Sequence, residues 1–512
     1  MLQGLNAHKA QGPDELPARV LKDLAFEIAP ALTRIFQESY DQGLVPEDWR
    51  KANVSPIYKG KNSSKSDPAN YRPVSLTCIC SKLFEHILVK HMLEHFEAAD
   101  ILTDCQYGFR SRRSCETQLV TLVQDLMNNM AGGGQTDLIL LDFSKAFDKV
   151  PHRRLYYKLH HYGIRGKTLQ WIQNFLNNRQ QRVVVEGNAS SYASVDSGVP
   201  QGTVLGPLLF LVYINDLPDM VKHSKVRLFA DDAAIYRPIQ CPSDAVLLQD
   251  DLNQLALWEH KWQMEFHPKK CKVMHMSRAT SLVEMPYVLR GHQIDVTSTE
   301  SYLGVKLDNR LSWGPHISSV AGRATSKLSF LRRNLKIADS GTKSAAYLSL
   351  CRPNLEYCCT AWSPHNKGDI ENLEKVQRKA ARFCTDDYRR RSSPTSMIKS
   401  LGWESLEARR TKYRLALTYR IVHGIVSIPL DRYYHQARRQ TRTCNHSHKL
   451  IEPHTRIDYL AASFFYQSPL FWNALPAKMA EAPSLAAFKS RLAKYELPQP
   501  MLPHDKMGRR LP

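Results

Sequence analysis

Apolar residues near the start of the chain recur at helical spacing. The pattern over residues 15–45 predicts a helix that packs on a core and ends at the break DQGLVPEDW. Its apolar stripe consists of Leu21, Leu24, Ile28, Leu32, Ile35 and Phe36. The next segment, WRKANVSPIYKG, predicts a strand, and the Ser-, Asn- and Pro-rich KNSSKSDPANYRP predicts a polar loop with several positive charges.

The following two hundred residues or so alternate between helical and strand patterns. SKLFEHILVKHMLEHF predicts a helix. After the glycine-rich turn AGGGQ at 131–135, the continuous apolar run Leu138–Leu141 predicts a central strand buried on both faces, which ends at Asp142 and leads into another helix. QQRVVVEG and YASVDSGVPQG predict one hairpin. VRLFADDAAIYR predicts a second, whose tip carries two acids, although Asp-Asp is not a strong turn pair.

A long helix from about Ser243 to Trp262 is predicted next, followed by the strand-like segments FHPKKCKVMHM and SYLGVKL. Beyond residue 311 the pattern changes to helices with basic faces. In DIENLEKVQRKAARFC, the predicted buried stripe is Ile370, Leu373, Val376 or Gln377, Ala380 and Phe383, and Lys375, Arg378 and Lys379 face elsewhere. No fixed-period repeat is evident, which argues against a solenoid.

Length and charge change this picture. The chain has 512 residues, 43% of them hydrophobic, so we expect two or three structural units. It carries 70 Lys and Arg against 49 Asp and Glu, a net charge of +21. Residues 1–310 have 36 basic and 34 acidic side chains, whereas residues 311–512 have 34 and 15, a net charge of +19. An asymmetry that persists over so long a stretch favours a polyanionic partner, with nucleic acid the leading candidate.

The 11 cysteines are odd in number and irregularly spaced, so they do not form a disulfide framework, and a reducing compartment is expected. The N-terminus lacks the charged and apolar regions of a signal peptide, and no apolar run approaches the length of a transmembrane segment. We therefore expect an intracellular protein that is soluble or bound to a large partner.

Three acids stand where apolar strands end or turn: Asp142 after LILL, and Asp231 and Asp232 after LFA. Converging carboxylates require a cation, and oxygen ligands with open coordination positions suit Mg²⁺. Two such ions would hold an attacking 3′-hydroxyl, a triphosphate and its leaving group in line. Taken singly, Asp142 could instead cap a helix, and the other two could form an exposed turn.

The motifs together resemble those of the reverse transcriptases of non-LTR (LINE-type) retrotransposons. In the palm of that family, the similar segments are LLDFSKAFDKV, SGVPQGTVLGPLLFLVYINDL, LFADD, FHPKKCKVM and YLGV. GPDELPARVLK, WRKANVSPIYKG, NYRPVSLT and QYGFR resemble its fingers, and RPNLEYCCTAWSP, LEKVQRKAARF and SFFYQSPLFWNALP resemble the region after the polymerase. The resemblance covers almost the whole chain.

The resemblance implies an α+β right-hand polymerase. We expect an N-terminal helical extension of the fingers over 1–39, a reverse transcriptase domain of fingers and palm over 40–308, a helical thumb over 309–400, and a basic nucleic-acid-binding region over 401–512. The implied activity is RNA-directed DNA synthesis, with an RNA template, a DNA primer, the RNA–DNA duplex and dNTPs as partners. A non-catalytic RNA-binding protein on a decayed or co-opted scaffold is the alternative, and a group II intron maturase-like protein is disfavoured.

The resemblance also assigns roles in catalysis. Asp142 and Asp231 would ligate two Mg²⁺ ions, for which Mn²⁺ could substitute, with Asp232 completing the site and the carbonyl of Phe143 as a further ligand. Phe147 would lie beneath the sugar and exclude a 2′-hydroxyl; the alternative is a core phenylalanine on a helix.

Further residues would bind the substrate. Gly202 would let the backbone approach the nucleotide and template base, and Gln201 could hydrogen-bond there, although the triplet alone would be a turn. Lys59 and Arg72 would grip the triphosphate, although each in isolation would be surface charge. Lys270 would protonate the pyrophosphate leaving group, a role for which Lys269 and Lys272 also compete.

The chain departs from the family in several places. His267 stands where Asn is usual, and Glu15 where Gly is more common. An endonuclease domain is expected to be missing ahead of the polymerase. Cys444, His446, His448 and His454 in TCNHSHKLIEPH match no standard zinc spacing, so a solvated polar loop is expected rather than a zinc site. The family's need for chromosomal DNA implies a nuclear location with a cytoplasmic ribonucleoprotein stage; the RNA copied and the oligomeric state stay open.

Overall fold

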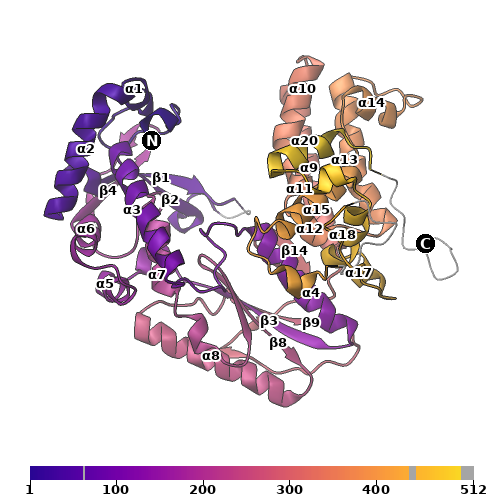
Figure 1. Cartoon of the computed structure of the whole chain (residues 1–512), viewed down its shortest axis with the longest axis horizontal. Coiled ribbons are helices and arrows are strands. Elements are labelled where there is room, and N and C mark those ends of the chain that lie inside the picture. The colour runs from indigo at the N-terminus through magenta and orange to yellow at the C-terminus, as the bar shows by residue number, and fades with distance from the viewer. Residues whose placement is uncertain (61–63, 437–445, 498–512) are drawn as a thin grey trace.

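The computed structural model describes residues 1–60, 64–436 and 446–497. They form two five-stranded mixed sheets with covering helices and two small hairpins, followed by a helical part that begins after residue 313 (Figure 1). The predicted α+β class is therefore confirmed. None of the helices in these ranges is both long and apolar enough to cross a membrane.

The predicted N-terminal helix is divided into α1 (Ala18–Asp23) and α2 (Ala25–Gln42). The residue between them, Leu24, has non-helical backbone angles (φ −102°, ψ 30°). Leu21 and Leu32 are buried, but Leu24 and Ile35 are exposed, so the prediction of one continuous stripe was wrong at these two positions. Upstream, Glu15 has a φ of +53°, a left-handed conformation that favours glycine.

The first sheet has the strand order β2-β1-β4-β5, and β6 also pairs with β4. Its strands are β1 (Lys51–Tyr58), β2 (Tyr71–Leu76), β4 (Arg179–Val185), β5 (Asn188–Ala189) and β6 (Ala193–Val195). The antiparallel pairing of β4 with β6 confirms the first predicted hairpin. Residues Tyr71 to Pro73 were predicted as loop but belong to β2, because they extend its antiparallel pairing with β1.

Four helices pack around the first sheet and toward the second: α3 (Ile79–Ala98), α5 (His152–His161), α6 (Gly166–Leu176) and α7 (Leu205–Ile214). The helix predicted within α3 is confirmed. Phe84, Trp171 and Phe210 are among the side chains that join these helices in one buried cluster. The helix expected directly after Asp142 is instead a short 3₁₀ turn at Phe147–Lys149, and the α-helix begins only at His152.

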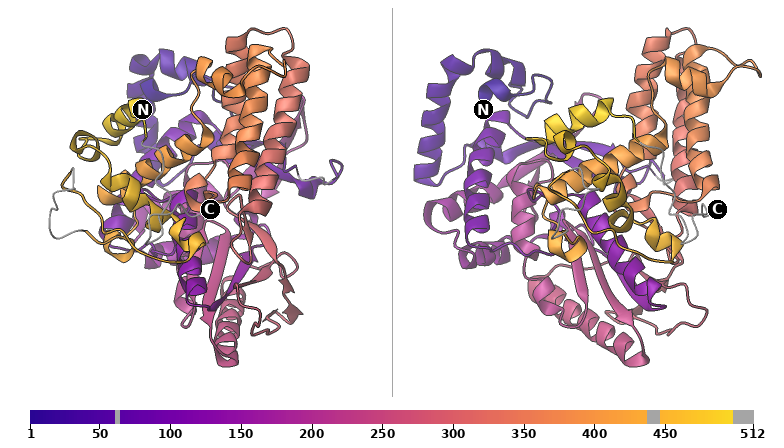
Figure 2. Two further views of the ribbon diagram at one scale, coloured as in Figure 1. Left: turned by 90° about the vertical axis from the view of Figure 1, so that its right-hand side faces the viewer. Right: turned by 45° about the vertical axis from the view of Figure 1, so that its right-hand side comes forward.

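The second sheet has the order β12-β9-β3-β8-β7. Its strands are β3 (Gln135–Asp142), β7 (Lys225–Phe229), β8 (Asp232–Ile239), β9 (Lys272–Met276) and β12 (Asp295–Val296). β3 lies in the middle and is buried from its first residue to Leu141, as predicted. Ile139 packs with α8 (Pro242–Trp262), and Leu138 with α4 (Cys115–Ala131). The two helices therefore cover opposite faces of β3 (Figure 2).

Two predicted strands differ in detail. SYLGVKL is a hairpin of β13 (Thr299–Tyr302) and β14 (Val305–Asp308), because Leu303 and Gly304 both take positive φ and reverse the chain. In FHPKKCKVMHM only Lys272–Met276 is a strand, and the residues before it form a turn. A second small hairpin joins β10 (Val288–Leu289) to β11 (His292–Gln293).

The helical part begins with a bundle around its own buried cluster. Its elements are α9 (Gly314–Asn334), α10 (Ser340–Ala346), a π-helical segment (Tyr347–Cys351), α11 (Arg352–Glu356), α12 (Cys359–Trp362), α13 (Lys367–Thr385) and α14 (Pro394–Ser400). Leu328, Tyr347 and Phe383 lie in this cluster. The predicted stripe of α13 is confirmed, with both Val376 and Gln377 buried, except that Ile370 is only partly buried.

The last described helices pack back onto the second sheet. They are α15 (Leu406–Val422), α16 (Leu430–Tyr433), α17 (Asp458–Ala461), α18 (Phe464–Asn473), α19 (Ala477–Ala480) and α20 (Leu485–Lys494). Leu415, Trp472 and Phe488 share one buried cluster with Leu122 of α4 and Leu138 of β3. The part of the chain after residue 400 is therefore tied to the body of the molecule rather than packed separately.

Candidate active site

Backbone pairing brings the three predicted acids to one end of the second sheet. Asp142 is the last residue of β3 and Asp232 the first of β8, and the two are Cα partners across the antiparallel strands. Asp231 occupies the turn between β7 and β8, where Ala230 takes a φ of +53°. The predicted hairpin with acids at its tip is confirmed, and residues about ninety positions apart in sequence meet there.

A buried glutamine that the sequence analysis did not single out supports this turn. Gln106 is 2% exposed, and its side-chain oxygen accepts hydrogen bonds from the backbone N–H groups of Ala230 (2.9 Å) and Gly108 (2.7 Å). A Cβ on Gly108 would lie 2.3 Å from the Ala230 nitrogen, so only glycine allows this contact. The QYGFR motif therefore fixes the backbone that presents Asp231.

The charges at this end of the sheet interact. Burial among protein atoms raises the pKa of Asp231, the negative charge of Asp142 raises it further, and Arg72 on β2 acts in the opposite direction. Asp231 and Asp142 are thus close enough to repel one another, although part of the Asp231 surface is open to solvent. Two carboxylates in this relationship favour a bound cation.

The Asp142 carboxylate has an unused oxygen. Its Oδ2 is shielded from solvent and accepts no hydrogen bond from a described residue. The ammonium of Lys270 lies nearby, with Nζ 3.4 Å from Oδ2. The residues therefore fit a divalent cation in the chemistry of their donors: anionic oxygens, one of them sheltered and unsatisfied.

The acids do not form a ready-made cage. Within the described ranges, no group of three or more His, Cys, Asp and Glu side chains is arranged to hold a metal ion. The negative charge of Asp232 also acts on Tyr302 of β13, whose pKa is raised chiefly by burial. Mg²⁺ is often held by one or two carboxylates together with water and substrate phosphates, and two converging acids satisfy that pattern.

The backbone around Phe143 is fixed by a second pairing. Ser144 N–H donates to Glu265 O (2.8 Å), and His267 N–H donates to Asp142 O (2.7 Å). The carbonyl of Phe143 takes part in neither bond. Its ring is buried and stacks on Phe266 with a centroid distance of 4.3 Å.

Phe147 lies five residues after Asp142, at the start of the 3₁₀ turn. Its ring is partly buried and stacks on Phe210 of α7, with a centroid distance of 4.4 Å and an interplanar angle of 17°. The Phe147 carbonyl accepts a hydrogen bond from Val199 N–H (2.7 Å). Stacking therefore holds the ring, the hydrogen bond from Val199 holds the backbone, and the residue is not on an α-helix.

The PQG segment links β2 of the first sheet to the 3₁₀ turn that follows β3. Ser75 N–H of β2 donates to the carbonyl of Gln201 (2.7 Å), and Gln201 Nε2 donates to Asp148 Oδ1 (3.1 Å). Gly202 has a φ of +104°, and a Cβ on it would lie 2.6 Å from the carbonyl oxygen of Ser75. The close backbone approach that this glycine allows is thus an approach of β2, which carries Arg72.

The two predicted triphosphate-binding cations lie in different surroundings. Arg72 is exposed on β2 and acts electrostatically on Asp231. Lys59 Nζ instead donates to the carbonyl of Ala69 (2.8 Å), in the connection between β1 and β2. The structure therefore brings Arg72, but not Lys59, into electrostatic contact with the acids.

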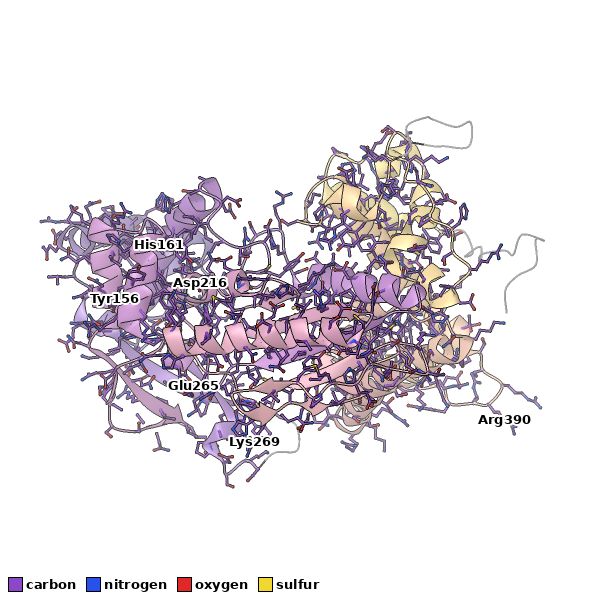
Figure 3. The ribbon with its side chains drawn as sticks, turned by 90° about the horizontal axis from the view of Figure 1, so that it is seen from below. Tyr156, His161, Asp216, Glu265, Lys269 and Arg390 are labelled. Atoms are coloured by element: carbon purple, nitrogen blue, oxygen red, sulfur yellow. The ribbon has the colours of Figure 1, made fainter. Side chains whose placement is uncertain are left out.

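The three candidate lysines are also separated. Only Lys270 reaches Asp142, because Lys272 Nζ donates to Asp295 Oδ2 (2.7 Å) on the neighbouring strand β12. Lys269 is exposed and, with Glu265, lies at the lower edge of the view in Figure 3.

A second buried acid stabilises the helix that follows PQG. Glu85 of α3 is fully buried, and its Oε2 accepts hydrogen bonds from Val204 N–H (2.8 Å) and Leu205 N–H (2.9 Å) at the start of α7. Burial raises the pKa of Glu85. This contact could not be predicted from the sequence, because Glu85 lies within an ordinary helical pattern.

Among the described residues, the histidines of TCNHSHKLIEPH belong to no group of three or more metal-binding side chains. His446 is buried against Trp472, with ring centroids 5.5 Å apart, so the prediction of a solvated loop was wrong there. Its Nε2 lies 2.9 Å from the Trp472 carbonyl oxygen, which anchors it in the core. Cys444 lies outside the described residues.

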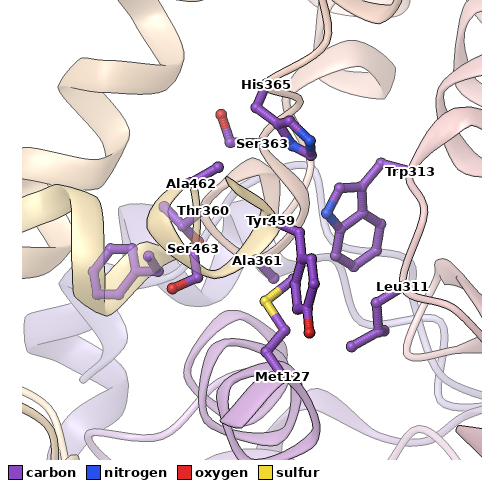
Figure 4. Close-up of a pocket in the computed structure, with 11 residues that line it drawn as sticks. Met127, Leu311, Trp313, Thr360, Ala361, Ser363, His365, Tyr459, Ala462 and Ser463 are labelled. Carbon is purple, nitrogen blue, oxygen red and sulfur yellow. The ribbon is translucent and has the colours of Figure 1, made fainter. Parts of the chain in front are cut away.

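One small pocket lies at the junction of α4, α12 and α17 (Figure 4). Met127, Trp313 and Tyr459 line it, and none of the three acids does. The pocket lies between α4 and the C-terminal helices, apart from the acid site.

Comparison with known proteins agrees with this geometry. Residues 60–307 match the family model described as reverse transcriptase (RNA-dependent DNA polymerase). Three relatives from Drosophila melanogaster are named RNA-directed DNA polymerases or probable ones. That of transposon BS is 29% identical over 403 residues, covering 75% of this chain and 44% of the relative.

The other two give similar values. The protein of transposon X-element is 28% identical (74% of this chain, 42% of the relative), and that of mobile element jockey is 27% identical (75% and 43%). The chain therefore spans less than half the length of these curated relatives.

Proposed function

Because residues 60–307 belong to the reverse transcriptase family, of the type encoded by non-LTR retrotransposons, we propose that this protein is an RNA-directed DNA polymerase that extends a primer 3′-end. One observation carries the proposal. Asp142, at the end of β3, and Asp231, in the turn before β8, interact: burial and then the charge of Asp142 raise the pKa of Asp231, and Oδ2 of Asp142 accepts no hydrogen bond from a described residue. This is the charge arrangement that phosphoryl transfer needs around its cations.

In this proposal the first sheet and its helices are the fingers, the second sheet is the palm, and α9 to α14 are the thumb of a right-hand polymerase. The boundaries near residues 39, 308 and 400 stay predictions. The RNA template and the growing RNA–DNA duplex would then lie between the fingers and the thumb.

Asp142 and Asp231 would hold two divalent cations, Mg²⁺ in the first instance, with the Phe143 carbonyl as a further oxygen donor and Asp232 completing the charge. When bound, such ions supply charge neutralisation for the triphosphate and activation of the primer 3′-hydroxyl. The Asp142 oxygen that lacks a hydrogen bond is the donor most available for this purpose.

The remaining residues would position the dNTP. Arg72 would bind the triphosphate, since its charge already acts on Asp231. Lys59 would reach the triphosphate only after its hydrogen bond to the Ala69 carbonyl is broken. Gln201 and Gly202 would form part of the surface beneath the nucleotide, because their backbone contacts hold β2 in position. Phe147 would meet the sugar where a 2′-hydroxyl projects.

Lys270 would donate a proton to the pyrophosphate as the bond to the α-phosphorus breaks. The ammonium is placed for this by its proximity to Asp142. A primer on chromosomal DNA would require a nuclear stage, preceded by assembly with the RNA in the cytoplasm.

The experiment is primer extension by the purified full chain on an RNA template with Mg²⁺ and dNTPs, beside the double variant Asp231→Ala, Asp232→Ala. We expect incorporation by the wild type alone. Equal incorporation by both proteins would show that the acids are not the site. No incorporation by a folded, RNA-binding wild type would favour the alternative of a non-catalytic RNA-binding protein.

A further inference from the structure

A groove at the end of α9 combines cations with an exposed aromatic ring. Arg332, Arg333 and Lys336 line it from α9 and the residues that follow. Asp386 and Tyr388 line it from the loop between α13 and α14. Tyr388 is 51% exposed, so part of its ring is open to a partner.

The positive charge of this groove is not neutralised from within. Asp386 is already paired with Lys343, whose buried ammonium lies 2.5 Å from its carboxylate. Asp387 is paired with Arg389 at 2.9 Å. Among the described residues, no ion pair is formed by Arg332, Arg333, Lys336, Arg390 or Arg391. The groove therefore presents a net positive surface to a partner.

The loop that carries Tyr388 is held in one shape. The Arg382 guanidinium donates hydrogen bonds to the carbonyls of Asp387 (3.2 Å), Arg389 (3.1 Å) and Ser392 (3.1 Å). Hydrogen bonds from Arg389 and Ser392 hold the pKa of Asp387 well below its usual range, so this carboxylate remains charged and keeps its contacts. A binding surface that is preorganised loses less conformational entropy when its partner binds.

Tyr388 is flanked by charge as well as exposed. The guanidinium carbon of Arg332 lies 5.3 Å from the centroid of its ring. An aromatic ring beside arginine is a platform on which a nucleobase can stack while neighbouring cations contact the phosphates. Stacking requires an unpaired base, which favours single-stranded RNA over a duplex.

The groove lies away from the space between the first sheet and the helical part. In Figure 1 the loop before α14 projects from the helical part to the side opposite the first sheet. In Figure 3, Arg390 lies at the far end of the molecule from Lys269 and Glu265, which neighbour the acid site. A nucleic acid in this groove would therefore not be the segment being copied.

We propose that this groove, lined by Arg332, Arg333, Lys336 and Tyr388, is a second nucleic-acid site that binds single-stranded RNA outside the polymerase cleft. One base stacks on Tyr388, and the adjoining phosphates contact the three cations. The site goes beyond the proposed polymerase function and does not depend on it, because binding here needs neither the acids nor a metal.

The test measures binding of a short labelled single-stranded RNA to the full chain that has first been saturated with an unlabelled RNA–DNA primer–template duplex. The variants are Tyr388→Ala, Tyr388→Phe, and the pair Arg332→Gln, Arg333→Gln. The matched control is Arg19→Gln, Arg34→Gln, which removes the same charge from exposed positions on α1 and α2. Primer extension on a short template is measured for each protein.

We expect Tyr388→Ala to weaken binding about tenfold, and Tyr388→Phe to bind like the wild type. The arginine pair should lower the slope of log affinity against log salt by about 1.4, and the control pair should not. Primer extension should be unchanged in all of them. Wild-type affinity in Tyr388→Ala, or tighter binding of a competing duplex than of single-stranded RNA, would overturn the proposal whatever the polymerase result.

Discussion

The ammonium of Lys270 lies 3.4 Å from Oδ2 of Asp142, the oxygen that accepts no hydrogen bond from a described residue. This contact distinguishes three neighbouring lysines that the sequence alone left equivalent. Lys272 is committed to Asp295, and Lys269 is exposed. A proton donor has to be near the reacting phosphates, and only Lys270 is near an acid of the site.

We predict that Lys270→Ala lowers the rate of single-nucleotide addition by about a hundredfold, since a positioned general acid is worth roughly that much or more. Lys269→Ala is the matched control and should remain near the wild-type rate. The measurement is single-turnover extension at saturating dNTP. An equal loss in both variants would mean that neither lysine acts specifically.

Phe147 is predicted to set the preference for deoxynucleotides. Phe147→Val should reduce the ratio of kcat/KM for a dNTP to that for the matching ribonucleotide by about tenfold or more, because the smaller side chain leaves space for the 2′-hydroxyl. Phe210→Leu is the control, since it removes the stacking partner and keeps the Phe147 ring. An unchanged ratio in Phe147→Val would return Phe147 to the role of a core residue.

Glu259 gives a prediction about pH. This residue of α8 is 5% exposed, and burial raises its pKa to about 7, although Phe266 N–H donates to it at 2.5 Å. Because the folded protein holds this proton more tightly than the unfolded chain, its stability falls as pH rises from about 4.5 to about 7 and then levels off. Glu259→Gln removes that loss and keeps a hydrogen-bond acceptor.

The free energy of unfolding of Glu259→Gln should therefore rise relative to that of the wild type between about pH 4.5 and pH 7, by an amount on the order of 3 kcal/mol at neutral pH. Glu265→Gln should show no pH trend across this interval and should instead lose stability relative to the wild type as pH rises toward about 4.5, since Lys149 lowers the pKa of Glu265 below that value. Thermal midpoints at several pH values measure both. A constant difference between Glu259→Gln and the wild type would contradict the prediction.

Cations of the C-terminal helices are predicted to contact the template–primer duplex. Deleting residues 400–512 would expose the cluster around Trp472 and Phe488, so substitutions test this role more cleanly. Lys489→Gln, Lys494→Gln on α20 should weaken duplex binding and lower its salt slope by roughly 1 to 2. The control is the double variant Lys22→Gln, Lys90→Gln, which removes the same charge from α1 and α3. Equal slopes in both pairs would exclude α20 from the duplex interface.

The sequence predicted the parts of the site that depend on local pattern. The continuous apolar run before Asp142 predicted a buried strand, and it is the middle strand of the second sheet. The segment VRLFADDAAIYR predicted a hairpin with two acids at its tip, and the structure has that hairpin. Roles assigned by resemblance, including those of Phe147 and Lys59, stay predictions until they are tested.

What the sequence could not predict depends on contacts between distant segments. Gln106 supports the turn at Ala230 through a pairing between residues more than a hundred positions apart. The close approach of the Ser75 backbone to Gly202 likewise joins residues that are distant in sequence. A local pattern can also mislead: Leu24 and Ile35 are exposed, because the one-residue break between α1 and α2 changes which residues face the core.

The central claim is that Asp142 and Asp231 together hold the cations of an RNA-templated DNA polymerase. The most direct measurement is the single-turnover rate of nucleotide addition on an RNA template, titrated with Mg²⁺, for the wild type, Asp142→Asn and the surface control Asp250→Asn. We predict that Asp142→Asn binds the duplex but loses at least about a thousandfold in rate at every Mg²⁺ concentration, while Asp250→Asn matches the wild type. An Asp142→Asn rate close to that of the wild type would contradict the claim.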